Sequence, residues 1–217
     1  KESECFMKVK NASKNQLRRF PIYLSYLRER QAEGMEFISS PQIAMSLNLS
    51  EEQVRKDLNL ISSKSGKPKI GRDIKLLIYD IEEFLGYRDS RKAILIGAGH
   101  LGRALMAHDG FSSYGLDIIC AFDNDINKTD CIFNNKHIYS LGELERITIE
   151  SNVHIAILTV PQKYAQEICD KLVAIGIRGI WNFTSAVLEV PEGVIVQNEN
   201  MASSLAILSN KLKELLY

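Results

Sequence analysis

The residues with the clearest chemical meaning form a glycine-rich turn near the middle of the chain. The turn has the pattern G-x-G-x-x-G and consists of Gly97, Ala98, Gly99, His100, Leu101 and Gly102. In such a turn the first glycine allows a sharp bend and the second lets the backbone approach a pyrophosphate. The third lets a helix pack closely on a strand, and the helix start offers free N–H groups to phosphate oxygens. The pattern alone is weak evidence, so the flanking segments decide its meaning.

The segments around this turn have the order that a dinucleotide-binding unit requires. Residues 93–96 are apolar and predict a buried strand, and residues 101–106 follow the turn with apolar positions at helical spacing. A second apolar run, residues 116–122, ends in Asp123 with Asn124 beside it. An acidic residue at this place accepts hydrogen bonds from ribose hydroxyls. The segment therefore predicts a site for NAD+ or NADH; the alternative is a glycine-rich turn that binds nothing.

The remainder of the second half continues the alternation of strands and helices. Residues 153–160 are too uniformly apolar for a half-exposed strand and predict a central parallel strand. Residues 164–175 have the spacing of an amphipathic helix, and residues 179–183 and 194–196 predict further strands. The fold class is α/β, with a doubly wound parallel (Rossmann) sheet. Ligands of such sheets bind at the carboxyl ends of the strands, where the sequence has Thr159, Val160, Pro161 and Phe183.

The first half has the pattern of a winged-helix domain. Residues 17–31 predict a helix, Ser39 and Pro41 predict the start of a second, and Ser50 predicts the start of a third. Two short helices joined by a tight turn form a helix-turn-helix unit. A basic loop with glycine and proline follows, and residues 74–78 predict a strand that returns from it. Helices followed by a hairpin predict a winged helix.

Basic and polar side chains gather on the exposed face that this arrangement predicts. Residues 1–88 hold 16 Lys and Arg against 12 Asp and Glu, whereas residues 89–217 hold 11 against 15. A basic unit joined to an acidic one indicates that the first half meets a polyanion. The alternative is a winged-helix module that binds protein. The side chains expected to contact DNA are Arg18, Ser40, Gln53, Arg55, Lys56, Lys64, Lys67 and Lys69.

Composition sets limits on the class of protein. The chain has 217 residues, of which 45% are hydrophobic and 25% charged, as in globular domains. No apolar run has the length of a membrane span, and no signal peptide is recognisable, so we expect no membrane partner. The four cysteines and four histidines show no metal-ligand spacing, so we expect no metal site. Cysteines without a disulfide or metal-binding pattern are typical of proteins in the reducing cytoplasm.

Several motifs resemble those of the redox-sensing transcriptional repressors called Rex. The strongest are residues 156–161, 176–183 and 188–191 in the second half, and residues 18–23 and 53–58 in the first. The resemblance covers most of residues 16–217. It implies a homodimer that binds a palindromic operator when NAD+ dominates and leaves it when NADH binds. It also implies a C-terminal helix that is exchanged between subunits and lies between the partner's two domains.

The resemblance and the residue pattern together give a division of the chain. Residues 1–88 are expected to form the winged-helix DNA-binding domain, residues 89–199 the Rossmann NAD(H)-binding domain, and residues 200–217 the dimerisation helix. NAD+ and NADH differ only at the nicotinamide ring, so an apolar pocket there would disfavour the cation and admit the neutral ring. Thr159, Val160, Pro161, Phe183 and the partner's C-terminal helix are expected to line that pocket.

The chain departs from the family at the wing and at two positions of the switch. The wing usually carries phenylalanine, several glycines and tyrosine, whereas residues 59–68 are richer in lysine and poorer in glycine. His108 stands where the family commonly has a tyrosine near the nicotinamide, and Asn200 where it has an aspartate that pairs across the dimer. Asn200 cannot form a charged pair with Arg18 or Arg19, so we expect altered switching.

Two other classes of function are considered. An NAD-dependent oxidoreductase would need a general acid or base near the ring, and the candidates His100, His108, His137 and His154 lack an obvious orienting carboxylate. The interpretation is therefore a non-enzyme without catalytic residues. The other alternative is a constitutive DNA-binding protein whose Rossmann domain holds another adenine nucleotide, such as coenzyme A. Asp123 and Asp125 favour NAD over NADP, and Lys128 is the one residue that softens this preference.

Overall fold

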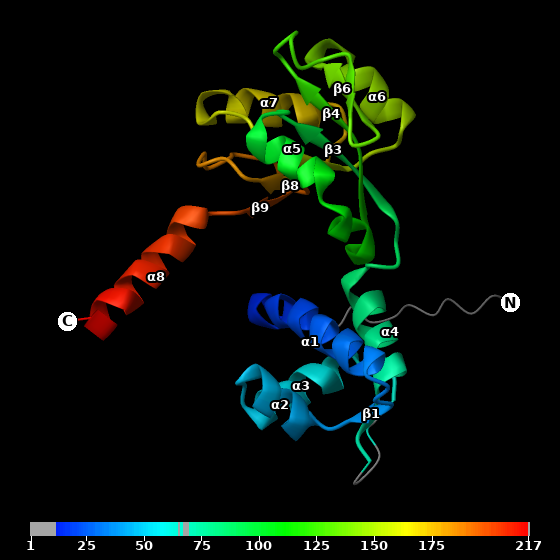
Figure 1. Cartoon of the computed structure of the whole chain (residues 1–217). Coiled ribbons are helices and arrows are strands. Elements are labelled where there is room, and N and C mark those ends of the chain that lie inside the picture. Colours follow the sequence, from blue (N-terminus) through cyan, green and yellow to red (C-terminus); the bar gives the residue numbers. More distant parts are fainter. Residues whose placement is uncertain (1–11, 65, 67–69, 217) are drawn as a thin grey trace, which may run out of the picture. The chain divides into compact units, whose positions relative to one another are not determined.

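The chain divides into two compact units. A computed structural model describes residues 12–64, 66 and 70–216. The first unit is Lys1–Asp89 and the second is Ser90–Tyr217. In the described residues the first unit holds four α-helices and a two-stranded ribbon, and the second holds a seven-stranded sheet with helices (Figure 1). No helix in these described ranges is long and apolar enough to cross a membrane.

Serine caps start three successive helices of the first unit. The side chains of Ser13, Ser39 and Ser50 each accept a hydrogen bond from the backbone N–H three residues ahead. Such caps satisfy N–H groups that have no partner inside a helix. The elements in chain order are α1 (Lys14–Ala32), β1 (Phe37–Ile38), α2 (Ser40–Leu47), α3 (Glu51–Ile61), β2 (Arg72–Asp73) and α4 (Ile74–Leu85).

The core of the first unit lies between its four helices. Phe20, Leu24 and Leu27 on α1 are fully buried and belong to the same cluster as Val54 and Leu58 on α3. Buried residues three or four positions apart give each helix one apolar face. Burial of side chains of this size stabilises a fold by about 1.5–3 kcal/mol each. The apolar faces therefore fix α3 against α1 and leave the opposite face of α3 exposed.

Residues 74–78 are helical, so the prediction of a returning wing strand there is wrong. They form the first part of α4, whose N-cap Asp73 accepts from the backbone N–H of Leu76 at 3.0 Å. The buried residues of α4 follow helical spacing, and Gly86 ends the helix with a φ of +69°. The strand that does pair is the short β2, antiparallel to β1. A capping aspartate and apolar residues at a helical period outweigh the β-propensity of the isoleucines.

The second unit is a doubly wound sheet. The strand order is β5-β6-β4-β3-β7-β8-β9, parallel except where β5 pairs with β6. The elements are β3 (Arg91–Ile96), α5 (His100–Ala107), the 3-10 helix η1 (Asp109–Tyr114), β4 (Leu116–Asp123), β5 (Cys131–Phe133), β6 (Lys136–Ser140), the 3-10 helix η2 (Leu141–Glu143), α6 (Leu144–Glu150), β7 (Ile155–Leu158), α7 (Gln162–Ala174), β8 (Gly179–Asn182), β9 (Ile195–Asn198) and α8 (Met201–Leu216).

Both faces of the sheet are covered, as expected for central parallel strands. Leu95 on β3 is buried in one cluster with Met106 on α5. The neighbouring Ile94 and Ile96 belong to a second cluster with residues of α6 and α7, such as Leu172. Alternate residues of one strand thus face different helices, which fixes the register of β3 in the sheet. Strands β5 and β6 and helix α6 are elements that the sequence analysis did not anticipate.

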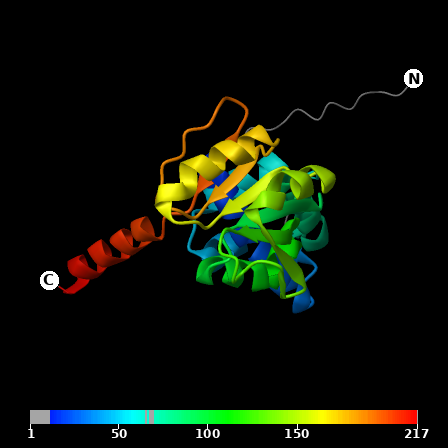
Figure 2. The same cartoon turned by 90° about the horizontal axis from the view of Figure 1, so that it is seen from above.

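Helix α8 follows the edge strand β9 and differs from the other helices in its exposure (red in Figures 1 and 2). Its side chains at positions 202–216 are all exposed within the chain. They include Leu205, Leu208, Leu212 and Leu215, each at least half exposed. The described residues of this chain thus leave an apolar helix uncovered.

Candidate functional site

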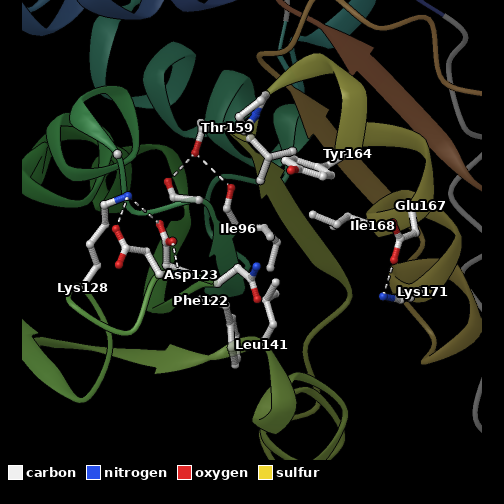
Figure 3. A pocket seen from close by; sticks show the side chains of 16 residues that line it. Ile96, Phe122, Asp123, Lys128, Leu141, Thr159, Tyr164, Glu167, Ile168 and Lys171 are labelled. Carbon is white, nitrogen blue, oxygen red and sulfur yellow. Dashed lines mark hydrogen bonds and ion pairs between the residues drawn. The ribbon is translucent and has the colours of Figure 1, made fainter.

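A pocket of about 640 Å³ lies at the carboxyl ends of β3, β4 and β7. Figure 3 shows its side chains converging from the glycine turn, the end of β4 and helix α7. The described lining residues are Ile96, Gly97, Gly99, Phe122, Asp123, Asn124, Asp125, Lys128, Leu141, Thr159, Val160, Pro161, Tyr164, Glu167, Ile168 and Lys171. This is the edge at which doubly wound sheets bind ligands.

Each of the three glycines in the turn occupies its position for a different structural reason. Gly97 has a φ of +100°, and its N–H donates to the carbonyl oxygen of Phe122 at 2.7 Å. A Cβ at Gly102 would collide with the carbonyl oxygen of Gly97, so this position needs glycine for the close approach of α5. A Cβ at Gly99 would meet no heavy atom of the chain within 4 Å. Gly99 therefore leaves space over the start of α5, where a ligand phosphate is expected.

Thr159 joins the glycine turn to β7. Its N–H donates to the carbonyl oxygen of Ile96 at 2.9 Å. Its hydroxyl lies 3.0 Å from the same oxygen and 2.8 Å from the carbonyl oxygen of Gly97 (Figure 3). These bonds hold the end of β7 next to the end of β3. Thr159, Val160 and Pro161, which the sequence placed at the carboxyl end of a strand, thus line one wall of the pocket.

Asp123 is the acidic residue expected at the end of β4, and it is held by two backbone donors. Its Oδ2 accepts from the N–H of Ala98 at 2.8 Å, and its Oδ1 accepts from the N–H of Asp125 at 2.8 Å. Lys128 Nζ lies 3.8 Å from Asp123 Oδ2 and 3.4 Å from Asp125 Oδ2 (Figure 3). A hydrogen bond from the backbone of Asn127, together with Lys128, holds the pKa of Asp125 below its usual range. Each carboxylate oxygen of Asp123 keeps a second lone pair for an incoming hydroxyl.

Several residues that line the pocket were not anticipated from the sequence. Phe122, Leu141 and Ile168 give the pocket an apolar floor. Glu167 and Lys171 lie one turn apart on α7 and form an ion pair of 2.7 Å at its rim (Figure 3). Phe122 directly precedes Asp123, so its position at a strand end was available as a signal. The α7 residues carried no such signal, because an amphipathic helix does not reveal which of its polar residues border a pocket.

Six predicted site residues are not among the residues that line this pocket: Ala98, His100, Leu101, Gly102, Phe183 and His108. Phe183 packs on Trp181 with 4.9 Å between ring centroids, and Trp181 contacts Phe111 at 5.6 Å. His108 is exposed at the end of α5 and lies edge-to-face on Phe111 at 4.8 Å. A continuous row of ring contacts through Phe111 and Trp181 therefore connects His108 to Phe183.

His154 is exposed just before β7, so its expected place within the buried strand is wrong. The backbone oxygen of His154 accepts from the N–H groups of Arg178 and Gly179. These bonds bring the residue to the amino end of the strand, where its side chain reaches solvent.

The predicted DNA-contacting residues lie on three elements of the first unit. Arg55 and Lys56 are exposed on α3, Arg18 on α1, and Lys64 just after α3. Lys56 pairs with Glu52 at 2.7 Å on the same face. Two further residues, Ser40 and Gln53, are half-buried, and Lys67 and Lys69 lie outside the described residues.

A charged cluster lies behind the exposed face of α3. It contains Arg19 but not the neighbouring Arg18. Arg19 donates to both oxygens of Asp57, at 2.7 and 2.9 Å, and Tyr23 and Gln16 donate to the same carboxylate. Burial would raise the pKa of Asp57, but these hydrogen bonds and the Arg19 charge outweigh it, so the pKa is lowered. Arg19 is committed to this cluster. Arg18 is exposed, with no ion-pair partner in the part of the chain that the structure describes.

Asn200 precedes helix α8 and serves it as a cap. Its Oδ1 accepts from the backbone N–H of Ser203 at 3.1 Å. Asparagine and aspartate are equally good at this position of a helix. Asn200 therefore caps the start of α8 without carrying a charge.

Family models match both units. A model described as "CoA binding domain" matches residues 88–186, and one described as "Putative DNA-binding protein N-terminus" matches residues 12–59.

Curated relatives cover most of the chain. A redox-sensing transcriptional repressor Rex of Treponema denticola is 46% identical over 192 residues, which are 88% of this chain and 91% of that protein. A protein of the same name from Bacteroides fragilis is 38% identical over 90% of this chain and 89% of its own.

Solved structures of a Rex-family repressor called RSP have the same fold. Its complex with β-NAD+ and operator DNA has a TM-score of 0.88 at 29% identity and covers 94% of each chain. Its complex with β-NADH has a TM-score of 0.84 at 29% identity, with 94% of this chain and 95% of that chain covered.

Proposed function

The chain belongs to the Rex family of redox-sensing transcriptional repressors, and from this premise we propose that it represses transcription according to the NADH/NAD+ ratio. It binds a palindromic operator when NADH is low and is released when NADH binds. The observation that carries the proposal is the pocket beside the glycine turn in a chain whose other unit exposes Arg55 and Lys56 on the second helix of a helix-turn-helix. Because its relatives in Treponema denticola and Bacteroides fragilis are transcriptional repressors, we assign it to the cytoplasm, where such cells keep their DNA.

We assign the DNA contacts to residues 1–88. Arg55 and Lys56 lie on the exposed face of α3, and the buried cluster around Asp57 holds the inner face of that helix. A recognition helix placed in the major groove contacts bases and phosphates with such side chains. Ser40 at the start of α2, Gln53 and Lys64 are assigned to the same interface, together with Arg18 and, beyond the described residues, Lys67 and Lys69.

We assign the dinucleotide to residues 89–199. Bound there, it supplies a ring whose charge depends on its oxidation state. Gly97, Ala98, Gly99, His100, Leu101 and Gly102 form the turn and helix start for the pyrophosphate, and the open space at Gly99 fits that role. Asp123 and Asn124 are assigned to the ribose on the β4 side of the pocket. Phe122, Leu141 and Ile168 offer an apolar floor that fits an adenine ring.

Discrimination between the two oxidation states is assigned to Thr159, Val160, Pro161 and Phe183, and to His108, which packs on Phe111. An apolar surface disfavours a cationic ring relative to a neutral one. A ligand that favours one conformation of the dimer weakens DNA binding through linkage. Converting a mostly open dimer into a mostly closed one requires about 5 kcal/mol of differential affinity. In the closed form the two recognition helices would no longer match half-sites about 34 Å apart.

Residues 200–217 are assigned to a homodimer. Helix α8 exposes a stripe of leucines that the described residues of its own chain leave uncovered, and a second copy would cover it. Exchange of this helix between subunits also brings it to the partner's pocket. Arg18 stays assigned to the DNA interface, and Arg19 is occupied by Asp57. Asn200, which caps α8, carries no charge.

The test is fluorescence-anisotropy titration of the full chain onto a palindromic operator from its own promoter, at fixed salt. Four conditions are compared: no ligand, NAD+, NADH and coenzyme A. We expect NADH alone to raise the Kd severalfold or more. Equal affinity in all four would contradict the switch and favour a constitutive DNA-binding protein. An effect of coenzyme A instead of NADH would identify a different adenine nucleotide as the ligand.

The proposal includes no catalysis. The described side chains that line the pocket include no histidine or cysteine, but Tyr164, Glu167 and Lys171 carry groups that can exchange a proton, so the oxidoreductase alternative needs a direct test. Incubating the protein with NADH and a range of carbonyl compounds, and following absorbance of the reduced ring, tests the oxidoreductase alternative. Steady turnover would contradict a purely regulatory role.

A further inference from the structure

One arginine joins the recognition helix to the segment that follows it. Arg72, the first residue of β2, donates from Nη2 to Asn59 Oδ1 near the end of α3. From Nη1 it donates to the carbonyl oxygen of Lys64 at 3.1 Å. The two acceptors lie on either side of the point where α3 ends. A single guanidinium group therefore links the last turn of α3 to the first residues of the wing.

Packing around Arg72 restricts its movement. The backbone of Arg72 pairs with Ile38 in the small ribbon, and a Cβ at Gly66 would come within 3.1 Å of its Cγ. Burial lowers the pKa of the Arg72 guanidinium and the Asp80 charge opposes this, so the group stays protonated at neutral pH. Asp80 itself accepts from the N–H and the hydroxyl of Ser63 at 2.8 and 3.0 Å. The guanidinium thus lies in a small network that ties the wing to α4.

The contact fixes how Asn59 can hydrogen-bond to DNA. A guanidinium only donates, so the atom of Asn59 that faces it must be the oxygen. The amide nitrogen, with its two hydrogens, is then the group of Asn59 that remains available to hydrogen-bond to DNA. Asn59 is exposed on the same face of α3 as Arg55 and Lys56. An asparagine that reads adenine presents oxygen and nitrogen together, accepting from N6 and donating to N7.

We propose that Arg72 is a positioning residue that sets the base preference of the recognition helix by holding Asn59 as a hydrogen-bond donor. Such a donor favours guanine, whose O6 and N7 both accept, over adenine, whose N6 amino group would face a second donor. The inference rests on the proposed DNA binding. It goes beyond that proposal by assigning the chemistry of one operator position to Asn59 on α3 and Arg72 in β2.

The test is selection of bound duplexes from a random DNA library by the full-length protein. The variants are Arg72→Met, Asn59→Ala, their combination, and Asn59→Asp. Arg28→Met is the matched control, because Arg28 pairs with Glu82 at 2.9 Å and lies on α1. The wild type is expected to select guanine at one symmetric position of each half-site. Arg72→Met should shift the guanine-to-adenine ratio there by about tenfold.

The remaining variants separate positioning from a direct contact. Asn59→Ala should remove the preference at that position, and adding Arg72→Met should change it no further. Asn59→Asp keeps the partner of Arg72 but has no donor, so it should reject guanine while remaining folded. The control should select the same sequence as the wild type.

Three results would overturn the inference. One is a uniform loss of affinity in Arg72→Met with unchanged base preferences and a salt slope lower by about one, which would make Arg72 a phosphate contact. Another is continued selection of guanine by Asn59→Asp. The third is a wild type that selects no sequence, which would also remove the proposed DNA-binding function. The first two leave that function intact, so the two failures are distinguishable.

Discussion

Arg19 on α1 and Asp57 on α3 form a two-point ion pair, with Nε 2.7 Å from Oδ2 and Nη2 2.9 Å from Oδ1. Tyr23 donates to the same carboxylate at 2.8 Å. The pair spans 38 residues of sequence and lies directly behind the exposed face of the recognition helix. It therefore orients α3 without itself being available for DNA.

Loss of this carboxylate should destabilise the first unit. Asp57→Asn leaves the Arg19 guanidinium without its countercharge, and such a loss at a buried pair costs about 3 kcal/mol. We expect faster hydrogen exchange of backbone amides in α1 and α3 of the full-length variant. Glu52→Gln is the control, since it removes an exposed carboxylate paired with Lys56. Equal protection of wild type and Asp57→Asn would mean that apolar packing alone holds α3.

The same carboxylate predicts a dependence of stability on pH. The pKa of Asp57 is lowered in the folded protein, so its contribution is complete above the unfolded pKa of about 4. It is lost as pH falls through the lower, folded pKa. As pH falls below about 4, amide protection in α1 should fall more steeply in the wild type than in Asp57→Asn. Parallel pH profiles of the two proteins would contradict the assignment.

Two glycines of the turn should respond differently to alanine. Gly99→Ala meets open space, so we expect unchanged thermal stability of the free protein and at least a tenfold weaker NADH affinity by calorimetry. In Gly102→Ala the new Cβ collides with a backbone oxygen, so stability should fall as well. Unchanged NADH affinity in Gly99→Ala would show that the dinucleotide lies away from this turn.

Arg55 should contribute to DNA binding through charge. Its side chain is exposed on α3. If it contacts only phosphate, Arg55→Ala should weaken all operators alike and lower the salt slope by about one. Titrations at several salt concentrations measure this slope. A relaxed preference at one base pair would instead place Arg55 on a base edge.

The elements that could be predicted from sequence are those whose pattern is local. The glycine turn, β3, β4 and α7 follow from strand runs, helical spacing and a fixed motif. Residues 74–78 were misread because a short apolar run fits both a strand and a buried helix. The decisive local signal was Asp73, a helix cap placed just before the run.

The parts of the site that escaped prediction depend on contacts between distant segments. Phe122 and Ile168 share a pocket floor only because the strand order places α7 across from the end of β4. The bond between Arg72 and Asn59 joins residues 13 positions apart through a loop of no regular pattern. Arg19, and not Arg18, pairs with Asp57 because of the way α1 is turned about its own axis. The sequence spacing does not decide which of two adjacent residues faces the neighbouring helix.

Cysteine chemistry should be separable from dinucleotide sensing. Burial raises the pKa of Cys120 to about 12, and Cys169 is also buried with a raised pKa. In a Cys5→Ser background, a disulfide reagent at pH 8 should therefore modify Cys131 first. Cys131→Ser should leave the effect of NADH on operator binding unchanged. Loss of that effect would indicate a thiol contribution to the switch.

A single charge on α8 should separate the subunits. Leu205, Leu208 and Leu212 lie on one stripe and are exposed within the chain. If a second copy covers this stripe, Leu208→Glu buries an unpaired carboxylate in the interface, which is costly. Sedimentation velocity should then show a monomer that binds a palindromic operator more weakly than the wild type. Asn210→Glu places the same charge on the opposite side of the helix and should remain dimeric. A dimer that tolerates Leu208→Glu would mean that the subunits associate through another surface.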